Sequence, residues 1–419
     1  MRKGTLVTLG LLAALVVTAG TPCYAAFTIG GENGWQLTTD GIVDVFSYYD
    51  STTKAPGGNH SMATDLLDNG STTAYNQRFG IGVGLLPSVV AFNVKAPTTN
   101  GVDSTVRIGI YPSISNAAAG TSGNATGNNR FSTGSNIDFR EIFYTAKGAY
   151  GELLAGKALN LYQGQNILTD MTLLTAGVVG APGNSVTLGH IGSGYLYTGF
   201  GPQIRYTTPD MAGFKLAVEV GEPYNITADT GKTNSPRVES EISYAQVIGG
   251  ASVHAWLDGL YQTAPRKDSA TMRPGANDES IGGAYGVSVG FSGLNLLGSG
   301  YGGRGLGMAS VQDGATFGDS EDALGRTRLY WGYLLQATYK LTPTVTVGAN
   351  YGQCRQERNE NEPVGAIIMK NQESGVFNVV YNFNKFTQFI AEYTYAQNTW
   401  MDSAKQHSNI FALGTMFYW

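Results

Sequence analysis

Apolar and polar residues alternate along much of the chain, and this alternation is its dominant pattern. In the clearest run, 328–340, a Leu, Trp, Tyr or Ala occupies every second position, and 344–351 and 377–383 repeat the pattern. Side chains of a β-strand point alternately to its two faces, so each run predicts one apolar face with aromatic residues and one face rich in polar and small residues. The sequence therefore predicts an all-β fold.

The connections between the predicted strands are long and short in turn. Eight long loops are expected at 50–73, 115–136, 159–198, 223–237, 263–280, 304–327, 354–373 and 399–406. Seven short turns are expected near 97–103, 148–150, 209–212, 249–250, 292–293, 341–343 and 384–385. These connections imply about sixteen strands, although 74–96, which contains Pro87, fits either one bulged strand or two. An even strand count with long loops at one end is typical of a transmembrane antiparallel β-barrel.

Alternation alone also fits a soluble β-sandwich, which would bury its apolar faces. The content of aromatic residues favours a membrane barrel over a sandwich. The chain has 24 Tyr and 17 Phe, and membrane barrels border their apolar band with aromatic residues. The last twelve residues, 408–419, form an alternating strand that ends in Gly414-x-x-Phe417-x-Trp419. This ending matches the assembly signal of outer-membrane proteins, so we expect a barrel in the bacterial outer membrane.

The N-terminus predicts export. Arg2 and Lys3 precede an apolar run at 6–17, and Cys23-Tyr24-Ala25 follows as a small-x-small ending. This order describes a secretory signal peptide cleaved after Ala25, which leaves 26–419 as one domain. A membrane anchor fits less well, because the apolar run is shorter than the roughly 20 residues that a helix needs to span a membrane.

Composition excludes several classes of function. The net charge of −5 argues against a nucleic-acid partner, which requires a basic surface. Beyond the signal peptide only Cys354 remains, so no intramolecular disulfide is possible, and no stretch of 18 apolar residues predicts a transmembrane helix. The four His are dispersed without ligand spacing, so we expect no metal and no cofactor.

Residues 159–198 stand apart from the strand pattern. They are rich in Gly, have no alternation, and contain one acid, Asp170, and one histidine, His190. A segment this long without a secondary-structure pattern is usually functional or disordered, and this one is too apolar to remain disordered in water. We therefore expect a loop that folds into the barrel and narrows its channel.

Alternation also predicts which charges face the interior. Arginines at four positions alternate with apolar residues and are expected in the lumen: Arg78, Arg107, Arg140 and Arg205. Each would cost roughly 2–4 kcal/mol if it faced lipid at the midplane. In this scheme Phe139 and Phe143 face outward, and Glu141 points toward lipid or a subunit contact. Few acids are expected beside the arginines: Asp40, Asp44 and Asp138. Solvated positions at the rim remain the alternative for any single arginine.

Several segments resemble the sixteen-stranded trimeric porins of Gram-negative bacteria. They are LTTDGIVD at 37–44, REIFYTAKG at 140–148, GELLAGK at 151–157 and QIRYTTP at 203–209. FNVKAP at 92–97 and the QIRY run are most similar to the dicarboxylate-specific, DcaP-like group. The resemblance implies a homotrimer with separate pores, makes 159–198 the inward third loop and places Lys157 in the lumen. General porins have several carboxylates in that loop, whereas this one has only Asp170.

These observations predict a passive diffusion channel for small hydrophilic solutes with a preference for anions, which pores obtain from Arg and Lys. The expected constriction residues are Arg78, Arg107, Arg140, Lys157, Asp170 and Arg205. Outer-membrane lipid and lipopolysaccharide are the expected surroundings. A structural or adhesive barrel is one alternative. A barrel hydrolase built on His254 and Asp258 is another, but no Ser motif accompanies that pair, so we expect no enzyme activity.

Overall fold

The structure is a computed structural model, and it describes residues 26–62, 65–67, 75–114, 137–180, 186–231, 233–311, 321–362 and 367–419. The expected signal peptide at 1–25 and the whole of the expected loop at 115–136 lie outside the described residues.

Strands make up most of the described chain. Their bounds are β1 (Phe27–Gly30), β2 (Gln36–Thr53), β3 (Tyr75–Gly82), β4 (Val89–Lys95), β5 (Asp103–Pro112), β6 (Ile137–Gly148), β7 (Gly151–Leu159), β8 (Phe200–Thr207), β9 (Phe214–Gly221), β10 (Arg237–Ile248), β11 (Ala251–Pro265), β12 (Asn277–Phe291), β13 (Leu294–Arg304), β14 (Leu329–Lys340), β15 (Val345–Gln356), β16 (Met369–Asn382), β17 (Thr387–Trp400) and β18 (Lys405–Tyr418).

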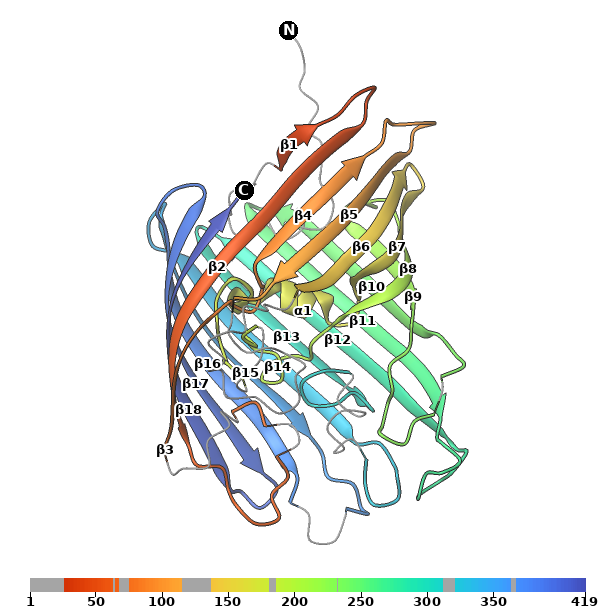
Figure 1. Ribbon diagram of the computed structural model, residues 1–419, viewed down its shortest axis with the longest axis vertical. Coiled ribbons are helices and arrows are strands. Elements are labelled where there is room, and N and C mark those ends of the chain that lie inside the picture. Colours follow the sequence, from red (N-terminus) through yellow and green to blue (C-terminus); the bar gives the residue numbers. More distant parts are fainter. Residues whose placement is uncertain are drawn as a thin grey trace, which may run out of the picture.

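The strands form one closed antiparallel barrel (Figure 1). From β4 onward each strand pairs with the next, and β18 pairs with β2 to close the wall. β3 pairs with 46–53 of β2 and β4 with 36–42, so together they occupy one position in the barrel. β1 pairs only with 37–39 of β2, beyond the end of β18. The barrel therefore has sixteen strand positions, as expected, and 74–96 contains two strands.

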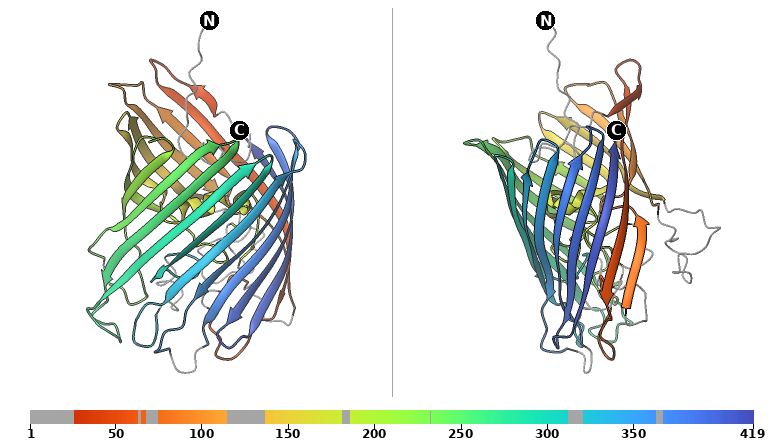
Figure 2. Two further views of the ribbon diagram at one scale, coloured as in Figure 1. Left: turned by 180° about the vertical axis from the view of Figure 1, so that it is seen from behind. Right: turned by 90° about the vertical axis from the view of Figure 1, so that its left-hand side faces the viewer.

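The two faces of the wall differ as the alternation predicts. Outward side chains such as Phe79, Leu257, Phe411 and Leu413 are exposed and apolar, which suits contact with lipid. Exposed aromatic residues gather near the short turns: Tyr150, Phe214, Phe291, Tyr339, Phe383 and Phe386. Figure 2 shows the long, tilted strands β10–β18 from behind. In the part of the chain that the structure describes, no helix is long and apolar enough to cross a membrane.

Part of the barrel interior is a packed apolar core. Inner-face side chains of β11–β17, among them Tyr330, Cys354 and Trp400, bury against Tyr162 and Leu196 of the expected third loop. Leu306, Met308 and Val311, from the segment after β13, join the same cluster. Protein cores pack without space for water, so this side of the interior leaves no aqueous path through the cluster.

The C-terminal residue completes the closure of the wall. The Trp419 N–H donates to Gly41 O at 3.2 Å, and the Gly41 N–H donates to Trp419 O at 3.1 Å. The indole of Trp419 lies against Gly41, where any side chain would overlap the ring. Gly41 therefore leaves room for the terminal aromatic residue, on the outer face of β2.

Removing Trp419 should impair barrel assembly while export continues. The truncation removes two hydrogen bonds worth about 1 kcal/mol each, together with the indole contact. We expect a large loss of the folded, heat-modifiable form in isolated outer membranes, whereas Trp419→Phe should retain most of it. Wild-type amounts of the truncated protein in folded form would contradict this role.

Candidate pore and constriction

Residues 159–198 form an ordered and mostly buried segment, of which 181–185 lie outside the description. The segment contains α1 (Gly164–Thr169) and η2 (Met171–Leu174). Figure 1 shows α1 within the outline of the barrel. Neither helix was expected from the sequence, because each is too short to show a helical repeat of apolar positions. Below, 159–198 is called the inner segment.

Carboxylates of the inner wall hold the inner segment through its backbone. Three of them accept hydrogen bonds, which join Tyr162 N to Glu239 Oε2 (2.7 Å), Gln163 N to Asp258 Oδ2 (3.1 Å) and Gly177 N to Glu392 Oε1 (2.6 Å). All three acids are buried, and they come from β10, β11 and β17. Hydrogen bonds of this kind contribute about 0.5–1.5 kcal/mol each. We refer to these acids as the anchoring carboxylates.

Sequence reasoning missed Glu239 and Glu392 and read Asp258 only as a polar lumen residue. The signal available in the sequence was weak but present. Glu239 alternates with Val238 and Ile242, whose side chains are exposed on the outer face. An acid on the inner face of such a strand needs a partner, and the N–H groups of an inner segment without strand pairing can supply one.

The break between β3 and β4 also holds the inner segment, on the side of the barrel near β17 and away from β10 and β11. Residues 83–88 turn inward, and the backbone of the inner segment pairs with them. The bonds join Leu85 N to Thr175 O (3.0 Å), Leu86 N to Leu173 O (3.0 Å) and Thr187 N to Gly84 O (3.3 Å). Gly84 allows this approach, since a Cβ there would lie 2.6 Å from the Thr175 carbonyl oxygen. The inner segment is thus fixed at two sides of the barrel.

Asp170 is buried inside this arrangement. Its carboxylate accepts from Thr172 N at 3.0 Å, from the Tyr195 hydroxyl at 2.7 Å and from Asn350 Nδ2 at 3.1 Å. Burial, and then the Asp170 charge, raise the pKa of Tyr195 well above its ordinary value, so the hydroxyl keeps its proton and donates. Asp170 therefore caps η2 and joins the inner segment to β15.

His190 makes a second connection to the wall. Its Nε2 lies 2.8 Å from Asn350 Oδ1, and its Nδ1 lies 2.9 Å from the Ser374 hydroxyl, which in turn lies 2.7 Å from the Ser193 hydroxyl. All four side chains are buried. This network joins the far end of the inner segment to β15 and β16.

The arginines expected in the lumen lie on the inner face of strands β3, β5, β6 and β8, and three of the four have ionic partners. Arg78 is 2.8 Å from Asp50, and Arg140 is 2.6 Å from Asp138. Arg205 donates to Leu159 O at 3.3 Å and lies opposite Glu219 of β9. Asp50, Glu219 and Glu141, described next, extend the set of acids beyond the few that were expected.

Two orientations expected in β6 are wrong. Phe143 is buried and faces inward, since it pairs with Arg107, and Glu141 also faces the interior, where its Oε2 lies 2.7 Å from Arg107 Nε. The register between β5 and β6 shifts between Gly109 and Tyr111, so β6 has a bulge there. A bulge adds one residue to a strand and changes the parity beyond it, which alternation alone does not reveal.

The inward assignment of Lys157 is also wrong. Lys157 pairs with Ile142 of β6, whose side chain is exposed on the outer face, and with Pro202 of β8. Leu153 and Leu154 are both apolar, so alternation in β7 did not separate the two faces. Lys157 therefore lies on the outer wall.

His254 and Asp258 do not form a catalytic pair. Their backbones are about 13 Å apart, because they are separated by four residues along a strand. In addition, Asp258 accepts a hydrogen bond from Gln163 N of the inner segment. The His254 ring lies 5.1 Å from the Trp256 ring. Among the described residues, no group of three or more His, Cys, Asp or Glu could hold a metal ion.

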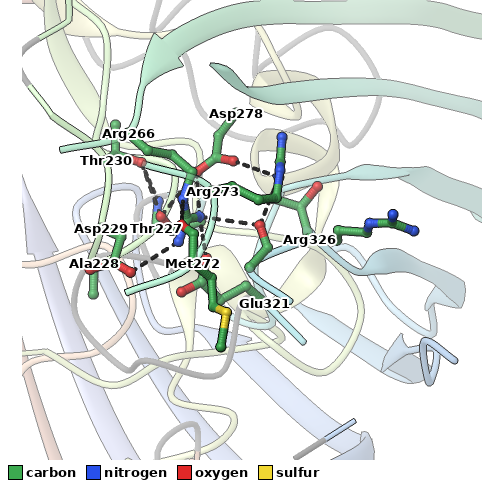
Figure 3. Close-up of polar contacts among 12 residues, drawn as sticks. Thr227, Ala228, Asp229, Thr230, Arg266, Met272, Arg273, Asp278, Glu321 and Arg326 are labelled. Atoms are coloured by element: carbon green, nitrogen blue, oxygen red, sulfur yellow. Dashed lines mark hydrogen bonds and ion pairs between the residues drawn. The ribbon is translucent and has the colours of Figure 1, made fainter. Parts of the chain in front are cut away.

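A charge cluster joins three of the long connections at the mouth of the barrel (Figure 3). Arg266 has no exposed side-chain surface and lies 2.9 Å from Asp229, 2.9 Å from Asp278 and 2.5 Å from Glu321. Arg273 donates to Gly325 O at 2.8 Å. The cluster therefore ties the connections after β9, β11 and β13 to one guanidinium, which a planar group with five donors can do.

Replacing Arg266 with Met should release these connections. Three carboxylates would lose their shared counter-charge, and breaking a buried pair typically costs about 3–5 kcal/mol. We expect faster cleavage of the connections by proteinase K in isolated outer membranes, with the barrel still heat-modifiable. Lys267→Met is the control, because Lys267 is exposed and its ammonium group donates to Ala228 O and forms no ion pair with the described residues. Unchanged digestion of the Arg266 variant would show that other contacts hold the mouth.

Comparisons with known proteins agree with this architecture. The channel DcaP of Acinetobacter baumannii has 15% identity and a TM-score of 0.69, over 94% of this chain and 100% of that one. An anion-selective porin from Comamonas acidovorans has 16% identity and a TM-score of 0.59, over 92% and 100%. The trimer form of OmpT from Vibrio cholerae has 12% identity and a TM-score of 0.50, over 92% and 100%. At these identities the likeness concerns the fold alone.

Sequence comparison supplies the family. A search of curated proteins finds no match to the chain. A family model described as Gram-negative porin matches residues 11–400, nearly the whole chain. Together with the sixteen-position barrel, this match shows that the chain belongs to the Gram-negative porin family of outer-membrane diffusion channels.

Proposed function

We propose that the protein is a passive pore for small hydrophilic solutes, with a constriction formed by the inner segment and a weak preference for anions. The observation that carries the proposal is the position of the inner segment. It is bonded to anchoring carboxylates on β10, β11 and β17, and it packs in the apolar core beside β11–β17. We expect the water-filled path beside Asp40, Arg107, Arg140 and Glu141, whose side chains on β2, β5 and β6 retain some exposed surface. Solutes would pass by diffusion, and no covalent bond would form or break.

The distribution of charge supports the direction of the preference. The anchoring carboxylates are buried and bonded, whereas Arg78, Arg107 and Arg140 retain some exposed side-chain surface. Field lines are focused between low-dielectric walls, so local charges matter more than the net charge of the chain. Acids beside each of these arginines weaken the effect, so we expect chloride to be favoured over potassium only slightly. The likeness to an anion-selective porin is consistent with this direction.

We also propose a homotrimer, whose contacts cover the outer faces of β7–β9. Strands β8 and β9 have 8 residues each, whereas β10–β18 have 11–15. A tilted strand needs about 9–11 residues to cross the hydrocarbon layer, so this side is too short for lipid alone. Lys157 on the same wall would be costly against lipid. Lipid and lipopolysaccharide would then surround the longer strands.

Conductance in a planar bilayer tests the proposal directly. The purified protein should insert as a heat-modifiable oligomer and produce stepwise, ohmic currents with a reversal potential slightly on the anion side in a KCl gradient. A structural or adhesive barrel would produce no current, and that result would overturn the proposal.

Deleting residues 164–192 tests the role of the inner segment. We expect the single-channel conductance to increase, because the segment no longer obstructs the interior. We also expect selectivity to move toward cations, because Glu392 would lose its N–H donors at Ala176 and Gly177 and would face water. A deletion variant that assembles and conducts as the wild type would show that the segment does not constrict the pore.

A further inference from the structure

The bulge in β6 places an additional acid in the lumen. Gly109 of β5 faces Glu141, but Tyr111, two residues on, faces Asp138. β6 thus has one more residue than β5 over this interval. As a result Arg140 and Glu141, which are adjacent in sequence, both contact groups of the interior. Arg140 lies over the Tyr111 ring at 5.5 Å, and the Tyr111 hydroxyl donates to Glu141 Oε2 at 2.7 Å.

Glu141 belongs to a group of three charged side chains, in which two acids, Asp40 and Glu141, contact one arginine, Arg107. Arg107 Nε lies 2.7 Å from Glu141 Oε2, and Arg107 Nη1 lies 2.9 Å from Asp40 Oδ2. Nη2 of the same guanidinium donates to the other Asp40 oxygen at 3.1 Å, so this pair is bidentate. Asp40 alone can satisfy the charge of Arg107, and Glu141 therefore leaves the group with a net charge of −1.

This group is accessible from the lumen. The side chains of Arg107, Asp40 and Glu141 are 11%, 17% and 16% exposed. The inner segment is close by, since Tyr111 packs in one buried cluster with Ala176. The anchoring carboxylates are hidden by their bonds, and Asp138 is matched one to one by Arg140. Among the described acids that contact Arg78, Arg107 or Arg140, Glu141 is thus the one that exceeds local neutrality.

We propose that Glu141 is a selectivity-determining residue, whose charge is not needed to balance Arg107 and therefore opposes the attraction of the lumen arginines for anions, which keeps the preference of the pore weak. The proposal rests on the proposed function as a diffusion channel. One unit charge about 5 Å from an ion in water changes its local concentration roughly fourfold. Salt screens this effect over about 8 Å at physiological ionic strength, so it should decrease strongly in 1 M salt.

Glu141→Gln tests the proposal with little change in shape. The amide oxygen still accepts from Tyr111, and the charge is lost. In a dilute KCl gradient we expect chloride to rise and potassium to fall by up to about fourfold each, so the ratio of their permeabilities should rise by up to about sixteenfold, and much less in 1 M salt. Glu141→Asp keeps the charge and should retain the wild-type ratio. Tyr111→Phe removes only the hydroxyl and should also leave the ratio near that of the wild type.

The outcomes separate this proposal from the proposed function. If Glu141→Gln conducts as the wild type with an unchanged permeability ratio, the role of Glu141 is overturned while the channel function stands. If the wild-type protein passes no current, the channel function fails and this proposal with it. Should Glu141→Gln not assemble, Asp40→Asn removes the other acid of the group, and an unchanged ratio in that variant would overturn the proposal equally.

Discussion

The structure depends on one kind of interaction, in which carboxylates of the barrel wall accept hydrogen bonds from the backbone of the inner segment. A segment of forty residues without strand pairing has many N–H groups that need acceptors away from bulk water. Glu239 and Asp258 supply acceptors on one side of the barrel. Glu392 and the inward turn between β3 and β4 supply acceptors and N–H donors on the other side. Packing then fills the interior between these fixed points.

The same arrangement divides the charges of the interior into two sets. Acids on β10, β11 and β17 accept hydrogen bonds from the backbone of the inner segment, and they have little effect on a passing ion. Arg107 and Arg140 on β5 and β6 and the acids that pair with them retain some exposed side-chain surface, and Asp40 and Glu141 share Arg107. A count of arginines on the inner face therefore overestimates the positive field, and the local pairing decides what an ion meets.

Alternation in the sequence was sufficient to predict the barrel, and it was insufficient to predict which side chains meet in the interior. It predicted the positions of the turns, such as 249–250 and 292–293, because a period of two residues is enforced by the difference between lipid and lumen. It failed at Phe143, Glu141 and Lys157, where a bulge or apolar residues on both faces obscure the parity. The anchoring carboxylates depend on which strands meet the inner segment, and this is a property of the closed barrel that no local pattern contains.

The bonds of the inner segment also imply an order of assembly. Gly177 and Glu392 are 215 residues apart in the chain, and Asp170 and Asn350 are 180 apart. Contacts so distant in sequence form late, because the chain between them must first be organised. The inner segment cannot reach its final position before β15–β17 are in place. The barrel wall is thus the template on which the pore is finished, and an incompletely closed barrel would have no defined channel.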